Sequence, residues 1–236
     1  MNEKLIEFND SLLAAAYPDR CFLCGAVIKY QTELCQDCRK TKTLIRGDIC
    51  TNCALPKNNC HCRKKSHFYN GISAPFLYKD EVRDGIWRWK FRDYRCSTEF
   101  FALMIASSTK RHFKDIDFDV ITFIPQTEKE KEKRGYNQGE ILADSVAEFM
   151  NLPCKSLLWK LYETERQHNL LKFERSGNIF GVFDVCDKTE VEGKNILLID
   201  DIKTSGATLD ECAKMLMINN AKAVYCAVIA VAENPK

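Results

Sequence analysis

The sequence lacks the features that anchor a protein in a membrane or direct it out of the cell. Its longest apolar stretch, residues 223–232, is far shorter than the ~20 residues that span a bilayer. The N-terminal segment carries Glu3, Glu7 and Asp10 where a secretory signal is basic, and Pro18 ends its apolar patch. We therefore expect a soluble protein without membrane insertion, located in the reducing cytoplasm.

An excess of charge of one sign is also missing. The chain has 35 Lys and Arg residues against 33 Asp and Glu residues, a formal net charge of +2, which argues against a general polyanion binder. No Gly-, Ser- or Pro-rich linker divides the chain, so any domains are expected to pack against one another. With 45% hydrophobic residues, the chain has enough apolar surface to fill a core.

Cysteine, in contrast, is abundant. Eight of the 13 cysteines lie between Cys21 and Cys62, and disulfides do not explain them in a reducing compartment. This density predicts a cysteine-rich zinc-binding domain over residues 1–70 and a second domain over residues 71–236. The other five are expected to be ordinary core or surface thiols: Cys96, Cys154, Cys186, Cys212 and Cys226.

The eight clustered cysteines have the spacing of zinc ligands. A C-x2-C couplet presents two thiolates to one ion, and two couplets complete a tetrahedral site. We predict one to two structural zinc ions, with the couplets paired in sequential order, although spacing alone leaves interleaved pairing and an iron–sulfur cluster open. His61 is an alternative ligand between two cysteines. The predicted metal ligands are Cys21, Cys24, Cys35 and Cys38, followed by Cys50, Cys53, Cys60 and Cys62.

Beyond residue 70, apolar strands alternate with amphipathic helices. Continuous apolar strands separated by helices are typical of a mostly parallel sheet that is covered on both faces, so the predicted fold class is α/β. Helices are expected over residues 80–91, 98–113, 137–150 and 208–218, and strands over residues 120–124, 157–162, 181–185, 195–199 and 223–231.

Two adjacent carboxylates and a hydroxyl-rich turn follow the strand expected over residues 195–199. Ligands bind at the carboxyl ends of strands in open α/β sheets, and backbone N–H groups at a helix start suit a phosphate. The carboxylates suit sugar hydroxyls or a magnesium-bound polyphosphate. A Walker B strand and a purely structural turn are the alternatives, but no G-x4-G-K-[ST] motif occurs in the chain. The predicted binding residues are Asp200, Asp201, Lys203, Thr204, Ser205, Gly206, Ala207 and Thr208.

This segment resembles the 5-phosphoribosyl-1-diphosphate (PRPP) signature of type I phosphoribosyltransferases, in which two acids precede a T-[ST]-G-x-T loop. The run from Arg134 to Gln138 (RGYNQ) and the element that begins at Thr164 (T-x2-Q-x2-L-x4-R) are similar to the ComF competence family. The chain departs from that family at Lys203, where an aromatic residue is common. The resemblance implies a type I phosphoribosyltransferase-like parallel sheet flanked by helices, with an N-terminal cysteine-rich zinc-binding domain.

The resemblance also implies a function. It points to a PRPP- and magnesium-binding protein of natural competence that handles incoming single-stranded DNA, with competence proteins as candidate partners. The alternative is an active phosphoribosyltransferase that acts on a nucleobase or nucleotide acceptor outside DNA uptake. By resemblance, the two acids hold the ribose hydroxyls, Arg134 is a candidate for diphosphate, and Arg175 lies on a flap over residues 163–180. The catalytic candidates are Asp200, Asp201, Arg134 and Arg175.

Two segments are candidates for nucleic-acid binding. Basic and aromatic residues alternate from Arg83 to Arg95, as they do on surfaces that bind single strands. On a helix, however, Trp87 and Phe91 share one face, and we expect that face to pack into the domain. The basic run over residues 63–65 is the second candidate.

Overall fold

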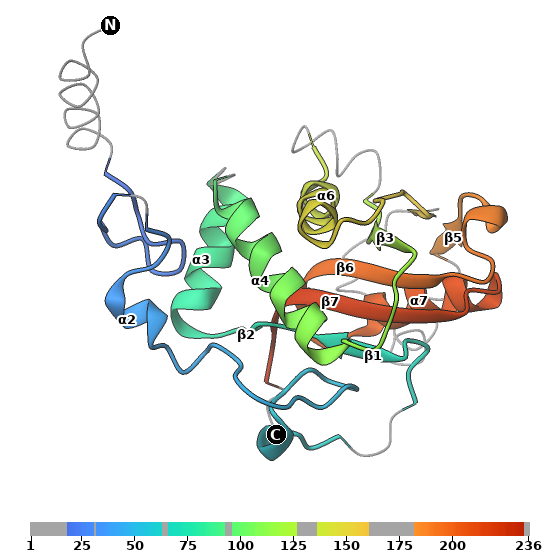
Figure 1. The fold of residues 1–236 in the computed structure, drawn as a ribbon, viewed down its shortest axis with the longest axis horizontal. Helices are drawn as coiled ribbons and strands as arrows, with labels where there is room; N and C mark the ends of the chain where they lie inside the picture. The colour runs from blue at the N-terminus through green and yellow to red at the C-terminus, as the bar shows by residue number, and fades with distance from the viewer. Residues whose placement is uncertain are drawn as a thin grey trace, which may run out of the picture.

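The core of the protein is a parallel β-sheet covered on both faces (Figure 1). The computed structural model describes residues 18–30, 32–62, 66–92, 96–126, 136–160 and 182–233. The strand order is β1-β7-β6-β3, and β2 also pairs with β7. Every pairing in this sheet is parallel. The strands are β1 (Gly71–Ser73), β2 (Phe76–Leu77), β3 (Val120–Phe123), β6 (Asn195–Lys203) and β7 (Ala223–Val231).

The predicted helices are confirmed to within one residue at each end. They are α3 (Asp80–Phe91), α4 (Ser97–His112), α6 (Gln138–Met150) and α7 (Ala207–Ile218). The predicted strands are confirmed with changed limits: β6 continues to Lys203, and β4 (Leu158–Lys160) pairs antiparallel with β5 (Phe183–Val185) outside the main sheet. The short elements are α2 (Gln36–Arg39), η1 (Lys57–Asn59) and η2 (Lys188–Glu190). No helix in the described part of the chain is long and apolar enough to cross a membrane.

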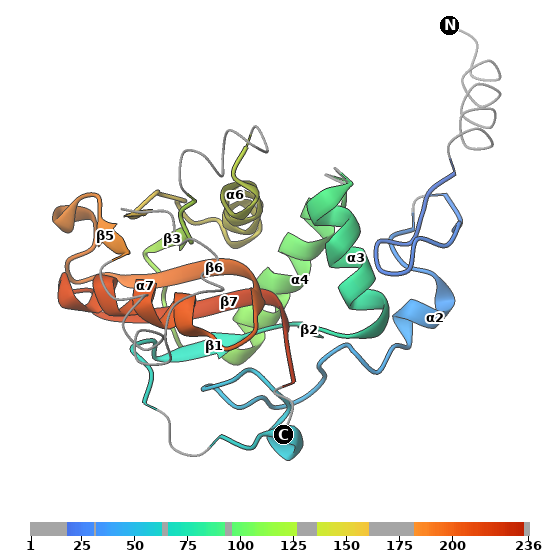
Figure 2. The same ribbon diagram turned by 180° about the vertical axis from the view of Figure 1, so that it is seen from behind.

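A separate apolar core lies on each face of the sheet, because side chains alternate along the strands. On β6, Leu197 and Ile199 pack with α3, α4 and α6, whereas Ile196 and Leu198 pack with α7 on the opposite face. The two views in Figures 1 and 2 show these helices on opposite sides of the sheet. The expected α/β architecture with both faces covered is confirmed.

The cysteine-rich segment packs against both cores. Leu23, from the first group of cysteines, is buried in the core with α3 and α4, and Ile49, from the second group, is buried in the core with α7. Backbone hydrogen bonds tie this segment to the sheet, including Ile72 N–H to Thr51 O at 2.8 Å. The two halves of the chain therefore form one packed body.

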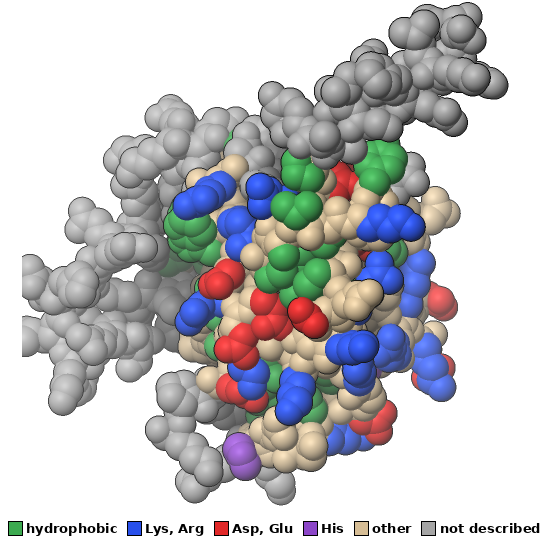
Figure 3. Space-filling view, turned by 90° about the vertical axis from the view of Figure 1, so that its left-hand side faces the viewer, with side chains coloured by type: hydrophobic (Ala, Val, Ile, Leu, Met, Phe, Trp, Pro, Cys, Tyr) green, Lys and Arg blue, Asp and Glu red, His purple; other side chains and the backbone are tan. Residues whose placement is uncertain are grey.

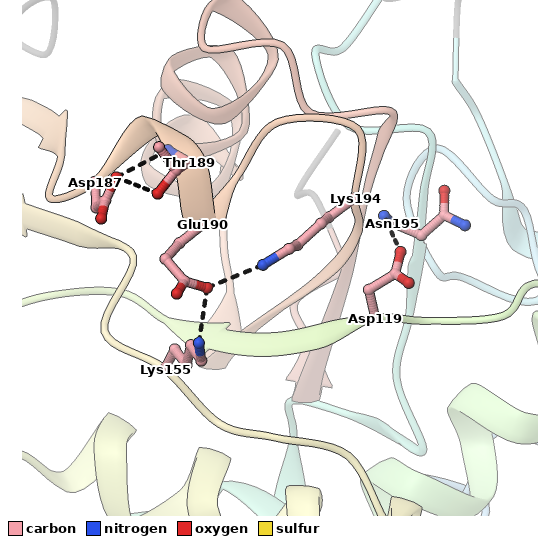
Figure 4. Close-up of polar contacts among 7 residues, drawn as sticks. All are labelled: Asp119, Lys155, Asp187, Thr189, Glu190, Lys194 and Asn195. Carbon is pink, nitrogen blue, oxygen red and sulfur yellow. Dashed lines mark hydrogen bonds and ion pairs between the residues drawn. The ribbon is translucent and has the colours of Figure 1, made fainter.

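A polar network holds the beginning of β6, at the end of the strand opposite the acidic pair (Figure 4). Glu190 accepts from Lys155 Nζ at 2.7 Å and from Lys194 Nζ at 2.9 Å. Asn195 N–H donates to Asp119 Oδ2 at 2.7 Å. The hydrogen bond from Lys155, followed by that from Lys194, lowers the pKa of Glu190 to about 2. These contacts hold the first residues of the central strand in place.

Candidate functional site

The eight clustered cysteines form two separate four-cysteine groups in sequential order. Within each group the sulfur atoms all lie within 4.8 Å of one another. The Sγ atoms of Cys24 and Cys35 are 3.7 Å apart, as are those of Cys53 and Cys60. A tetrahedral site with Zn–S bonds of about 2.3 Å has sulfur–sulfur edges of about 3.8 Å, whereas a disulfide measures about 2.05 Å. Sequential pairing is confirmed, and both groups are consistent with a structural zinc ion.

Backbone N–H groups prepare some of these sulfurs for a cation. Burial alone would raise the pKa of Cys21, but hydrogen bonds from backbone groups outweigh it and lower that pKa to about 7. The N–H of Cys62 donates to Cys60 Sγ at 3.4 Å and lowers the pKa of Cys60. His61 is exposed and belongs to neither group, so the all-cysteine sets stand. A dication bound in each group would favour the deprotonated, thiolate form of the other cysteines as well.

The two carboxylates of the predicted ligand site lie within β6 rather than after it. Asp200 pairs in register with Val228 of β7, and the strand continues to Lys203. By the alternation seen at Leu198 and Ile199, Asp200 lies on the α7 side of the sheet and Asp201 on the α3 side. Both carboxylates are half-buried. The acidic pair therefore straddles the strand near its carboxyl end.

The surroundings of Asp200 change the pKa of its carboxyl group. Burial, followed by the negative charge of Asp201, raises the pKa of Asp200 from 3.8 to about 7. The N–H of Asp201, which donates to Asp200 Oδ1 at 2.8 Å, and the ammonium of Lys90 act in the opposite direction. The carboxyl of Asp200 therefore holds its proton to a higher pH than an ordinary aspartate does.

Lys90 of α3 belongs to this site, and the sequence analysis missed it there. Its Nζ lies 2.5 Å from Asp201 Oδ2. A signal was present in the sequence: Lys90 follows the buried Val82 and Ile86 at positions i+8 and i+4, on the inward face of the helix. A lysine on an inward face indicates a carboxylate partner nearby, because burying an unpaired charge is energetically costly.

The loop after β6 presents polar groups at the surface. Thr204, Ser205 and Thr208 are exposed. Gly206 has a φ of +81°, which favours glycine, and a Cβ there would lie 3.0 Å from Lys203 Cε. The aliphatic part of Lys203 therefore packs against the glycine. Helix α7 begins at Ala207, whose N–H donates to Ser205 Oγ at 3.3 Å. The N–H groups of the next two residues, at the start of the helix, have no acceptor one turn earlier within the helix.

Two buried polar atoms at the same edge of the sheet have no partner among the described residues: Gln126 Oε1 and Asn137 Nδ2. They belong to this edge because β3 ends beside β6, with Ile124 N–H donating to Ile199 O at 3.3 Å. Unsatisfied buried groups are uncommon in folded proteins, and here they fit a polar ligand. Arg134, Arg175, the flap over residues 163–180 and the basic run over residues 63–65 lie outside the described residues.

The outer face of α3 carries an exposed aromatic pair. Trp87 and Phe91 share one face, with ring centroids 5.8 Å apart, but they are 48% and 58% exposed. The expectation that they pack into the domain is wrong, because Val82, Ile86 and Trp89 already fill the inward face. Cζ of Arg92 lies 5.2 Å from the centre of the Trp87 ring. Figure 3 shows the side of the molecule at the left of Figure 1, where a group of acidic side chains lies between hydrophobic side chains and several basic ones.

Comparisons with known proteins agree with these features. The double zinc ribbon domain family matches residues 12–69. The chain is 29% identical over 201 residues to competence protein ComFC of Bacillus subtilis (strain 168), covering 81% of this chain and 80% of that protein. It is 25% identical over 217 residues to the DNA utilization protein YhgH of Escherichia coli (strain K12), covering 88% and 94%.

Among solved structures, a purine phosphoribosyltransferase from Pyrococcus horikoshii Ot3 is similar at 16% identity, with a TM-score of 0.38. The match covers 57% of this chain and 73% of that one. The α/β fold follows from the strand order and parallel pairing of the sheet itself.

Proposed function

Because the chain belongs to the ComFC competence family, with an N-terminal double zinc ribbon and a phosphoribosyltransferase-like fold, we propose that it binds PRPP with Mg²⁺ and acts in handling incoming single-stranded DNA during transformation. The observation that carries the ligand proposal is the acidic pair near the end of β6, followed by an exposed loop that opens onto α7.

Each part of this edge suits one part of PRPP. The N–H groups and hydroxyls of residues 204–208 would hold the 5-phosphate at the start of α7, where the helix dipole favours an anion. Asp200 and Asp201 would accept from the ribose hydroxyls and place negative charge near the sugar carbon that becomes cationic during transfer. Bound Mg²⁺ would supply positive charge to the diphosphate oxygens. Gln126 and Asn137 would find partners on the ligand.

The zinc ribbons have a structural role in this proposal. Four protein ligands leave no open position for water, so each ion would stabilise a segment that is too small to have its own core. Elemental analysis of freshly purified, reduced protein should find two zinc ions per chain. Finding iron, or no metal, would remove the zinc assignment.

Calorimetry with PRPP and Mg²⁺ tests the ligand site. Replacing both acids (Asp200→Asn with Asp201→Asn) should weaken binding by roughly 100-fold or more, because hydrogen bonds to a charged group contribute about 1.5–3 kcal/mol each. Asp115→Asn is the matched control, because this exposed acid lies in the turn between α4 and β3. Equal affinity in the double variant and the wild-type protein would refute the site.

The second candidate is an active phosphoribosyltransferase that uses a nucleobase or nucleotide acceptor. The intact acidic pair beside the loop supports it, since turnover needs the same residues as binding. Release of diphosphate from PRPP in the presence of nucleobases, nucleotides or single-stranded DNA distinguishes the candidates. Release that depends on Asp200 and on an acceptor would establish an enzyme, whereas tight binding without release would favour a binding protein.

The exposed pair on α3 is the proposed contact for single-stranded DNA. Bases stack on aromatic rings at about 1–3 kcal/mol per base, and Arg92 adds a cation beside Trp87. Trp87→Ala with Phe91→Ala should weaken oligonucleotide retention by roughly tenfold or more, and added salt should weaken it further. Phe149→Ala, at an exposed position on α6, is the control. No binding of the wild-type protein at low salt would discard this part of the proposal.

A further inference from the structure

Lys90 links helix α3 to the acidic pair, although α3 is not part of the sheet. The Lys90 and Asp201 side chains are only 19% and 28% exposed, so their contact is largely shielded from water. Partial burial strengthens a charge pair relative to one on the open surface. This lysine is therefore part of the site rather than a solvated surface charge.

The first zinc ribbon, the segment from Cys21 to Cys38, holds α3 in place. Gly85 packs so closely on this ribbon that a Cβ would lie 2.6 Å from Phe22 O. The guanidinium of Arg88 donates to the carbonyl oxygens of Phe22 and Leu23, between the first two zinc-ligand cysteines. The ribbon therefore sets the position of the helix along its middle turns.

Helices α4 and α6 hold the residue just before Lys90. The buried Trp89 donates from Nε1 to Thr98 Oγ1 at 2.9 Å. Its carbonyl oxygen accepts from Gln138 Nε2 at 2.8 Å. The side chain of Trp89 is thus held by α4 and its carbonyl group by α6, so the backbone that carries Lys90 is fixed beside Asp201.

Binding of PRPP would change the charges at this edge. In the ligand-free protein, the ammonium of Lys90 compensates one of two neighbouring carboxylates and occupies Asp201 Oδ2. PRPP brings anionic oxygens, and its ribose needs hydrogen-bond acceptors. We propose that Lys90 is the resident counter-ion of Asp201, and that it exchanges this carboxylate for an anionic oxygen of bound PRPP. This inference rests on the proposed function, since it assigns a role within the same site.

Lys90→Met tests both halves of the exchange. Without its resident ammonium, the acidic pair should bind Mn²⁺ alone about tenfold more tightly, measured by electron paramagnetic resonance without PRPP. The same variant should bind PRPP with Mg²⁺ about 10- to 100-fold more weakly in calorimetry, the range expected for a charge-assisted hydrogen bond. Lys90→Arg keeps the positive charge and should stay within about threefold of wild type in both measurements.

Lys79→Met is the matched control. It removes the same charge from the residue before the first turn of α3, where Lys79 pairs with Glu233 at 3.1 Å in a contact that is 42% exposed on each side. It should leave both affinities unchanged. Zinc content and thermal unfolding confirm that each variant is folded, and Lys90→Gln replaces Lys90→Met if the latter loses zinc.

The outcomes separate this inference from the proposed function. Wild-type protein that binds PRPP, with Lys90→Met indistinguishable in either measurement, overturns the exchange and leaves the PRPP site intact. Wild-type protein that binds no PRPP overturns the proposed function and the exchange with it. In that case, a change in Mn²⁺ affinity would still identify Lys90 as the counter-ion.

Discussion

The close contact between α3 and the first zinc ribbon predicts an unusual response to a glycine-to-alanine change in a helix. Gly85 lies in the interior of α3, where alanine normally stabilises a helix by about 1 kcal/mol. Here, however, a Cβ would lie 2.6 Å from Phe22 O, 3.0 Å from Leu23 Cα and 3.1 Å from Leu23 O. All three are backbone atoms, which cannot move aside without shifting the turn that carries Cys21 and Cys24.

The clash is expected to exceed the gain in helix propensity. Overpacking a well-packed contact costs about 1–3 kcal/mol, and a rigid backbone places this contact toward the upper end of that range. Subtracting the helix gain leaves a net loss of about 1–2 kcal/mol for Gly85→Ala. The first zinc site should also weaken, because Phe22 and Leu23 lie between two of its ligands.

Urea unfolding at constant zinc, together with release of zinc to a colorimetric chelator, measures both effects. Asp84→Ala is the control, because the preceding, exposed residue of α3 gains helix propensity without a clash and should be neutral or slightly stabilising. A Gly85→Ala protein that is more stable than wild type and releases zinc at the same rate would refute the view that the ribbon and helix are closely fitted.

Three further changes have defined outcomes. The pKa of Asp200 is raised from 3.8 to about 7 in the folded protein, so stability should fall as the pH rises from about 4 to 7, and urea unfolding of Asp200→Asn should lose that slope. The pKa of Glu190 is lowered from 4.5 to about 2. The stability that its contacts with Lys155 and Lys194 contribute is therefore present above pH 4.5 and lost as the pH falls to about 2. Acid unfolding of Glu190→Gln should lack this pH-dependent loss of stability. Gly206→Ala should cost about 1 kcal/mol in thermal unfolding because of its φ of +81°, and calorimetry should show weaker PRPP binding.

Local sequence patterns predicted those helices and strands whose own residues carry a clear periodicity or apolar run. The apolar run that forms β7 and the 3.6-residue period of α3 need no knowledge of the rest of the chain. The same holds for the cysteine couplets, since short spacing brings neighbouring couplets together before more distant ones. Strands β1 and β2 were missed because they span only three and two residues and gain their order by pairing with β7, about 150 residues later.

Contacts between distant elements were beyond the reach of those patterns. Periodicity places Trp87 and Phe91 on one face of a helix, but it does not tell which face the rest of the protein covers. Lys90 and Asp201 are likewise joined only because α3 crosses the edge of the sheet where β6 ends. The candidate site depends on such contacts, so the sequence alone indicated its acids and loop but not Lys90, the cation that faces them.

The two groups of cysteines lie on opposite faces of the sheet, and each is linked to a helix that borders the acidic pair. The first ribbon holds α3, whose Lys90 contacts Asp201. The segment that follows the second ribbon holds the first turn of α7: Phe68 N–H donates to Asp210 Oδ1 at 2.7 Å, and His67 Nδ1 lies 3.5 Å from the same oxygen. Because successive side chains of β6 point to opposite faces of the sheet, Asp201 lies on the side of the first group of cysteines and Asp200 on the side of the second. Loss of metal from the first group of cysteines should therefore disturb the contact between Lys90 and Asp201. Loss of metal from the second group should disturb the loop at the start of α7.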